Sequence, residues 1–235
     1  MRLPSVYPAG TGAAVKYAKA YLKAEGCTIT DQEPDVVLLD VPTRLSLREL
    51  EDLMEVFPQS TVVCGGNLPV LPCPQLDLLK DTEYLAENAV ITAECALREV
   101  GEQLPSVLRE NTILIIGWGR IGKCLADLLG RFGADVTVTA RKEVDVAALH
   151  SLGLRADTPD RIRPGDYAAV INTAPAVVYD EAELEGCKLK IDLASCPGML
   201  GDDVIIARGL PGKYVPESSG RLIARRLLAL WKEAK

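Results

Sequence analysis

The stretch that decides the fold is residues 112–122, which read Thr-Ile-Leu-Ile-Ile-Gly-Trp-Gly-Arg-Ile-Gly. Its apolar run predicts a buried β-strand that leads directly into a Gly-x-Gly-x-x-Gly turn. In such a turn Gly117 permits the sharp change of direction, Gly119 lets backbone N–H groups approach a pyrophosphate, and Gly122 packs the next helix against the strand. The positive end of that helix then faces the phosphates. We therefore predict a dinucleotide site formed by Gly117, Trp118, Gly119, Arg120, Ile121 and Gly122.

The next expected strand, residues 135–139, bears on which dinucleotide binds. Sites that prefer NAD end this strand in an acidic residue that bonds the ribose hydroxyls. Here the strand runs into Thr139, Ala140, Arg141 and Lys142, and no carboxylate occupies that place. Arg141 and Lys142 can form charge-assisted hydrogen bonds with a ribose 2′-phosphate. This pattern favours NADP over NAD, although a basic pair is also common at any solvated strand end.

Composition excludes several classes of function. The 235 residues are 48% hydrophobic and carry a net charge of −7, which opposes binding to nucleic acid. No apolar run is long enough to span a bilayer, and the first residues lack a signal-peptide core, so we expect a cytoplasmic protein that makes no contact with membranes. The seven cysteines are scattered without a Cys-x-x-Cys pair, which indicates a reducing compartment and predicts no metal site. The only histidine, His150, falls in a predicted helix away from the expected nicotinamide position.

The alternation of strands and helices predicts an α/β protein with two α/β units. We expect residues 1–103 to form a smaller substrate-side domain, with a helix opened by Gly10–Gly12, strands at 36–41 and 61–64, and a helix introduced by the capping pair Ser46 and Glu49. The strand at 61–64 ends in Gly65-Gly66-Asn67, at the edge where open α/β sheets hold ligands. A helix beginning near Thr92 leads into the second domain.

Residues 104–218 are expected to form the dinucleotide-binding domain, a doubly wound parallel Rossmann-type sheet. The predicted elements are strands at 112–116, 135–139, 168–172, 189–193 and 203–207 and helices at 121–132 and 143–151. Residues 209–220 are expected to form a loop rich in glycine and proline. The final helix, 219–235 with Ser218 or Ser219 as its cap, packs on the second domain or returns to complete the first.

Polar residues at two strand ends are the candidates for chemistry. Asn172, Thr173 and Pro175 follow one strand, and Asp192 to Cys196 follow the next. Asn172 and Thr173 offer neutral hydrogen-bonding groups suited to a nicotinamide carboxamide or a carboxylate, although both are also ordinary turn residues. We place Thr92, Glu94, Asn172 and Ser195 as catalytic candidates, and Asn172, Thr173 and Pro175 with Thr139, Arg141 and Lys142 as cofactor-binding candidates. Lys213 could supply charge to an anionic substrate, and Glu94 could equally be a favourable charge in the first turn of a helix.

From about Asn88 to the C-terminal helix these motifs resemble the A subunits of dipicolinate synthases. The two most specific segments are Ile-Asp-Leu-Ala-Ser-Cys-Pro-Gly at 191–198 and Gly-Leu-Pro-Gly-Lys-Tyr-Val-Pro-Glu-Ser-Ser-Gly at 209–220. Ile-Asn-Thr-Ala-Pro at 171–175 and Asn-Ala-Val-Ile-Thr-Ala-Glu at 88–94 also fit. The first domain is shorter than that of the family. Cys196 stands where the family pattern has a basic residue, and Met199 replaces a glycine.

The resemblance implies an NADP-dependent oxidoreductase that oxidises dihydrodipicolinate, a dicarboxylate, to dipicolinate during sporulation. It also implies that the partner is a second, flavoprotein-like subunit; whether the chain forms a homo-oligomer stays open. Two alternatives remain. One is a catalytically weak NADP(H)-binding scaffold or regulatory subunit, and the other is an oxidoreductase resembling the 2-hydroxy-acid dehydrogenases. The latter enzymes pair a histidine with a carboxylate, and no histidine lies in the C-terminal third.

Overall fold

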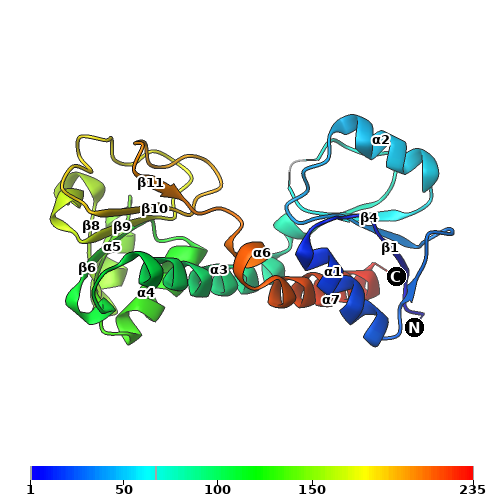
Figure 1. Cartoon of the computed structure of the whole chain (residues 1–235), viewed down its shortest axis with the longest axis horizontal. Helices are drawn as coiled ribbons and strands as arrows, with labels where there is room; N and C mark the ends of the chain where they lie inside the picture. Colours follow the sequence, from blue (N-terminus) through cyan, green and yellow to red (C-terminus); the bar gives the residue numbers. More distant parts are fainter. Residues whose placement is uncertain (1, 67, 235) are drawn as a thin grey trace. The chain divides into compact units, whose positions relative to one another are not determined.

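The computed structural model describes residues 2–66 and 68–234, which form two α/β units (Figure 1). Unit 1 runs up to Asn88 and resumes at Pro211, and unit 2 is Ala89–Leu210. From the sequence we expected the first boundary at 103/104. The contacts divide the chain instead inside a long helix, α3 (Thr82–Gln103).

Unit 1 contains a five-stranded parallel sheet in the order β2-β1-β3-β4-β5. The strands are short, and helices connect several of them. In chain order the elements are β1 (Ser5–Pro8), α1 (Ala13–Ala24), β2 (Thr28–Ile29), β3 (Val36–Leu38), α2 (Leu47–Val56), β4 (Thr61–Cys64), β5 (Gln75–Asp77), a 3-10 turn (Leu78–Lys80) and the start of α3. After unit 2 the chain adds α6 (Leu210–Tyr214) and α7 (Pro216–Glu233).

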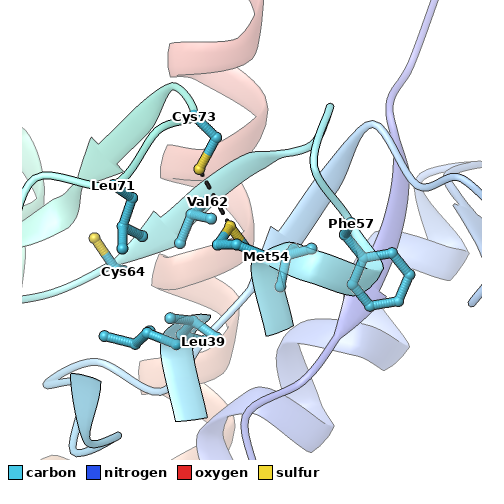
Figure 2. Close-up of a cluster of buried hydrophobic side chains, with 9 residues drawn as sticks. Leu39, Met54, Phe57, Val62, Cys64, Leu71 and Cys73 are labelled. Atoms are coloured by element: carbon cyan, nitrogen blue, oxygen red, sulfur yellow. Dashed lines mark hydrogen bonds between the residues drawn. The ribbon is translucent and has the colours of Figure 1, made fainter. Parts of the chain in front are cut away.

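Helix α2 covers one face of this sheet and closes a hydrophobic core (Figure 2). Its capping box is formed as the sequence predicts, because the Ser46 side chain accepts from the Glu49 N–H and the Glu49 carboxylate accepts from the Ser46 N–H. The buried side chains of the core are Val37, Leu39, Leu50, Met54, Phe57, Val62, Cys64, Leu71 and Cys73. The Cys73 thiol lies 3.2 Å from the Met54 sulfur, so these cysteines serve as small apolar side chains.

Helix α7 packs on α1 within unit 1. The two backbones approach so closely at Gly220 that a Cβ there would lie 2.3 Å from the Ala14 carbonyl oxygen. Arg226, on the same helix, is buried and bonds the carboxylates of Asp81 and Glu83 at the start of α3. Glycine and arginine thus fix the position of α7 against its neighbours in unit 1.

Unit 2 contains a six-stranded parallel sheet in the order β11-β10-β9-β6-β7-β8, which confirms the predicted doubly wound Rossmann-type fold. Helix α4 packs on β6 and β7, and α5 packs on β8. The elements are β6 (Thr112–Ile116), α4 (Arg120–Arg131), β7 (Asp135–Thr139), α5 (Glu143–Ser151), β8 (Arg155–Asp157), β9 (Ala169–Asn172), β10 (Leu189–Asp192) and β11 (Val204–Ile206), with short 3-10 turns at Leu108–Glu110, Pro159–Arg161 and Pro164–Asp166.

Three sequence expectations are wrong in detail. Helix α3 begins at Thr82 rather than near Thr92, because the Asp81 carboxylate accepts from the backbone N–H of Glu83 and Tyr84 and so caps it earlier. Residues 209–220 are not a loop, since most of them belong to α6 and α7. Neither Ser218 nor Ser219 caps α7: its N-cap is Val215, and Pro216 occupies the first helical position, where a proline is favoured.

Candidate dinucleotide site

The order of strands in unit 2 locates one candidate site. From β6 the chain moves outward through β7 and β8, then returns to place β9 on the other side of β6. The carboxyl ends of β6 and β9 therefore flank the point where the direction of winding changes. Doubly wound sheets bind their ligands at this switch point. Here the switch point lies between the turn after Ile116 and the turn after Asn172.

The turn after β6 has a backbone geometry that requires glycine at Gly117 and Gly122. Gly117 has φ +100°, a conformation that side chains with a Cβ rarely adopt. A Cβ on Gly122 would lie 2.2 Å from the carbonyl oxygen of Gly117, so only glycine allows α4 to sit this close to the turn. Gly119 is exposed, and a Cβ there would meet no described atom within 4 Å. The turn is thus tight on the protein side and open at Gly119.

The N-terminus of α4 is open to an anion, in contrast with that of α1. Gly119 is the N-cap of α4 and provides no side chain to accept from the first N–H groups. At the corresponding turn of unit 1, the Asp40 carboxylate accepts from the N–H groups of Thr11 and Gly12, at 3.0 and 2.9 Å. Asp40 therefore already neutralises the start of α1. Of these two helix starts, only α4 leaves its backbone donors for a ligand.

Thr173 connects the two turns of the switch point. Its hydroxyl donates to the carbonyl oxygen of Ile116 at 2.9 Å, and its backbone N–H donates to the same oxygen. The side chain that we expected to contact a cofactor thus holds the glycine turn in place. Pro175, two residues later, is exposed.

Asn172 has a different role from the one expected from the sequence. Its side chain is fully buried, and its amide donates to Asp192 Oδ1 at 2.8 Å and to the Ala174 carbonyl at 2.9 Å. Its Oδ1 accepts from the Ala174 N–H. An amide with both hydrogens bonded and no exposed surface positions its loop and does not reach a substrate, so we correct the catalytic role given to it.

Asp192, for which the sequence predicted no catalytic or cofactor-binding role, organises the loop after β10. This buried carboxylate accepts from Asn172 and from the backbone N–H groups of Ala194, Gly198 and Met199. Gly198 packs so tightly that a Cβ would lie 2.0 Å from the Asn172 amide nitrogen. Asn172, Asp192 and Gly198 therefore lock the ends of β9 and β10 together. An aspartate as the last residue of a buried strand was the available signal, but its partner Asn172 lies 20 residues earlier in the chain.

The remaining catalytic candidates differ in exposure. Ser195 is exposed on the loop that Asp192 holds. Thr92 is buried and Glu94 is exposed, both inside α3. Residues two apart on a helix face different directions, so these two side chains do not act together. Glu94 also lies three turns from the start of α3, which overturns the view of it as a first-turn charge.

Two cations follow β7, as the sequence suggested for NADP. Thr139 and Ala140 are buried, whereas Arg141 and Lys142 are exposed. Neither cation has an ion-pair partner among residues 2–66 and 68–234. The nearby carboxylates of Glu143 and Asp157 are paired with Arg161 instead, at 2.9 and 3.3 Å. Positive charge at the end of β7 is therefore left for a ligand.

Other expected groups lie away from this edge or serve locally. The His150 ring lies on α5, with Nε2 2.9 Å from the Ala156 carbonyl oxygen. Lys213 lies over the Tyr214 ring at 4.5 Å. In the Gly65-Gly66-Asn67 turn the Gly66 N–H donates to Asp77, and Asn67 falls outside the described residues. Across the described chain, no group of three or more histidine, cysteine or acidic side chains could hold a metal, and no helix has the length and apolarity to cross a membrane.

Two sequence comparisons match part of this chain. The family described as ketopantoate reductase PanE/ApbA matches residues 113–188, the segment that contains the glycine turn. The A subunit of dipicolinate synthase from Bacillus subtilis (strain 168) is 27% identical over 159 residues, which cover 62% of this chain and 54% of that protein. The match therefore spans about half the length of this relative.

Solved structures extend the likeness to nearly the whole chain. The A subunit of dipicolinate synthase from Bacillus halodurans is 21% identical and has a TM-score of 0.83, with 96% of this chain and 97% of that chain covered. The A chain of dipicolinate synthase from Bacillus subtilis is 19% identical and has a TM-score of 0.82, with 99% and 97% covered. The chain is thus an oxidoreductase-like Rossmann protein that resembles the A subunit of dipicolinate synthase in sequence and in fold.

Proposed function

We propose that this chain is an NADP-dependent dehydrogenase that oxidises dihydrodipicolinate to dipicolinate. The observation that carries the proposal is the open glycine turn of unit 2, with Gly119 uncovered and the N-terminus of α4 uncapped, in a segment similar to the A subunit of dipicolinate synthase. These residues fit a dinucleotide pyrophosphate. We place Trp118, Arg120, Ile121 and the three glycines around it.

The choice of NADP rests on the end of β7. Arg141 and Lys142 carry two charges that no described carboxylate neutralises, while Thr139 beside them is buried. A ribose 2′-phosphate would accept charge-assisted hydrogen bonds from both cations. NAD would leave these charges without a partner and would find no acidic residue in the usual place.

The reaction removes two electrons and two protons from the dihydropyridine ring. When bound, NADP⁺ supplies the acceptor for one hydride, and the second proton must go to a base or to water. Because the product ring is aromatic, the step needs correct placement more than a strong base. Among Thr92, Glu94, Asn172 and Ser195, we propose Glu94 as the proton acceptor, since it alone is an exposed carboxylate.

The loops after β9 and β10 would position the substrate. Thr173 fixes the glycine turn, and Asn172 with Asp192 fixes the loop that carries Ser195. We assign Ser195 to contact with the substrate. A substrate bound at this edge would contact loops that are fixed by hydrogen bonds, which favours a constant distance between the ring carbon and the hydride acceptor.

We also propose that the partner is a second, flavoprotein-like subunit, that the chain is cytoplasmic and that it acts in sporulation, all from the resemblance to the relative. The experiment mixes the purified chain with NADP⁺ and freshly generated dihydrodipicolinate, with and without the candidate partner. NADPH and pyridine-2,6-dicarboxylate are then measured by absorbance. We expect them in equal amounts from the chain alone or with its partner.

The same assay separates the alternatives. If NADPH binds tightly but no product forms in either mixture, the dehydrogenase proposal is wrong. If the partner alone forms product at the full rate and this chain only changes its regulation, the chain is a scaffold or regulatory subunit. As a control, the Gly119→Trp variant should form no NADPH, because a large side chain would fill the space at the turn.

A further inference from the structure

Arg208 lies at the carboxyl edge of the unit 2 sheet, two residues after the end of β11. β11 pairs with β10, so the segments that follow these two strands are neighbours (Figure 1). Arg208 Nε donates to the carbonyl oxygen of Ala194 at 3.0 Å. This bond ties the guanidinium to the loop that carries Ser195 and Cys196.

Arg208 keeps most of its hydrogen-bonding capacity. Its two terminal nitrogens have no acceptor, and its charge has no carboxylate partner, within residues 2–66 and 68–234. Asp192, at the end of the adjacent strand β10, is buried and already accepts from four donors. Arg208 is therefore a cation without a counter-charge at a ligand-binding edge.

The loop beside Arg208 offers further donors. Ser195 and Cys196 are exposed, and their backbone N–H groups have no acceptor in the described part of the chain. By contrast, Asp192 holds the N–H groups of Ala194, Gly198 and Met199. The Ser195 hydroxyl is likewise without a partner in that part of the chain. Donors on the loop after β10, and a guanidinium anchored to this loop from the segment after β11, are the features of a carboxylate site.

We propose that Arg208 is the substrate-specificity residue of this protein, and that the two terminal nitrogens of its guanidinium bind one carboxylate of a dicarboxylate substrate. The Nε bond to Ala194 fixes the plane of the guanidinium and leaves the end-on pair of nitrogens for a bidentate contact. Arg208 thus supplies, from the segment after β11, the positive charge that Cys196 does not supply on the loop after β10. The proposal rests on the proposed function for the identity of the substrate.

The test measures binding of a product-like probe, so that it does not depend on turnover. Pyridine-2,6-dicarboxylate is titrated calorimetrically into the unmodified chain and into the Arg208→Gln variant, both saturated with NADP⁺. We expect the dissociation constant to rise at least about tenfold in the variant, because a charge-assisted bidentate contact is lost. Arg208→Lys keeps the charge but not the fork and should give an intermediate value.

Two controls make the result specific. Arg131→Gln removes the same charge from an exposed arginine on α4 that pairs with Asp127, and it should leave probe binding unchanged. Binding of NADPH should be the same in Arg208→Gln as in the unmodified chain. Equal probe affinity in Arg208→Gln and the unmodified chain, or no probe binding to the unmodified chain, would overturn the proposal.

Turnover distinguishes failure of this inference from failure of the proposed function. If the unmodified chain oxidises dihydrodipicolinate and Arg208→Gln has the same KM, the function stands and the role of Arg208 is wrong. If dihydrodipicolinate is not oxidised, but the probe binds and Arg208→Gln weakens this binding, the carboxylate site is supported and the substrate is a different dicarboxylate.

Discussion

Gly119 and Gly122 lie three residues apart in one turn, yet their surroundings predict different effects of substitution. A Cβ on Gly119 meets no described atom and its backbone conformation suits any residue, so Gly119→Ala should leave the unfolding temperature nearly unchanged while it weakens dinucleotide binding. Gly122→Ala places a Cβ 2.2 Å from a backbone oxygen and should lower the free energy of unfolding by about 1–3 kcal/mol. Thermal unfolding and NADPH titration of both variants check this, and equal stability losses would contradict it.

Single residues also show where sequence reasoning stops. The roles of the three glycines could be predicted, because the Gly-x-Gly-x-x-Gly motif requires glycine at each position for a local reason of backbone geometry. The hydrogen bond between Asn172 and Asp192 could not be predicted, because these residues lie 20 positions apart in the chain. This bond uses side-chain atoms that would otherwise be free to contact a ligand. For the same reason the hydrogen bond between Arg208 and Ala194 could not be predicted from the sequence. Residue type therefore predicted the location of polar groups better than their roles.

The close approach of α7 to α1 depends on Gly220. Gly220→Ala puts a Cβ 2.3 Å from the Ala14 carbonyl oxygen and should destabilise unit 1 by about 1–3 kcal/mol, because two packed helices must separate. Gly101→Ala is the matched control in α3, where a Cβ meets no described atom within 4 Å. It should be neutral or stabilising by up to about 1 kcal/mol. Denaturant unfolding of both variants measures the difference, and a stability loss in Gly101→Ala as large as in Gly220→Ala would refute the packing argument.

The start of α3 predicts a dependence on pH. Burial raises the pKa of Asp81, but hydrogen bonds from Arg226 and from the backbone of Glu83 and Tyr84 outweigh it, so the pKa lies below its ordinary value. A carboxylate with a lowered pKa in the folded state contributes stability above its unfolded pKa, and this contribution is lost as the pH falls through the folded pKa. Asp81→Asn should therefore cost about 1–2 kcal/mol at neutral pH.

That cost should shrink as the pH falls from about 5 towards 2. The measurement is denaturant unfolding of both proteins across this range, where secondary structure still reports on folding. A difference between the two proteins that stays constant down to pH 2 would show that the charge of Asp81 does not act in this way.

Elements were predicted best where a long apolar pattern specifies them. The strands β4, β6 and β7 and the helix α5 have the bounds that the sequence predicted. Strands β1, β2, β5 and β8 were not predicted. The last three have only two or three residues, some of them polar, so they give no periodic pattern and form strands only through their neighbours. The early start of α3 depends on Asp81, which is held by Arg226 in a helix 145 residues later in the chain.

At the level of the whole chain, two parallel sheets offer two switch points, and their chemistry differs. In unit 1 the order β2-β1-β3-β4-β5 places its switch point beside the turn that Asp40 neutralises. In unit 2 the corresponding turn is uncapped and lies on the same edge as Arg141 and Lys142. We therefore propose that the dinucleotide binds unit 2, with one bound molecule for each chain.

Calorimetric titration of the purified chain with NADPH and with NADH shows whether unit 2 holds one dinucleotide and which one it prefers, because it reports affinity and stoichiometry together. We expect one site for each chain, an affinity for NADPH at least about tenfold higher than for NADH, and loss of most of this preference in Arg141→Ala. Arg131→Ala should keep the preference. Equal affinity for the two dinucleotides would contradict the role of Arg141 and Lys142, and no binding of either would contradict the dinucleotide site itself.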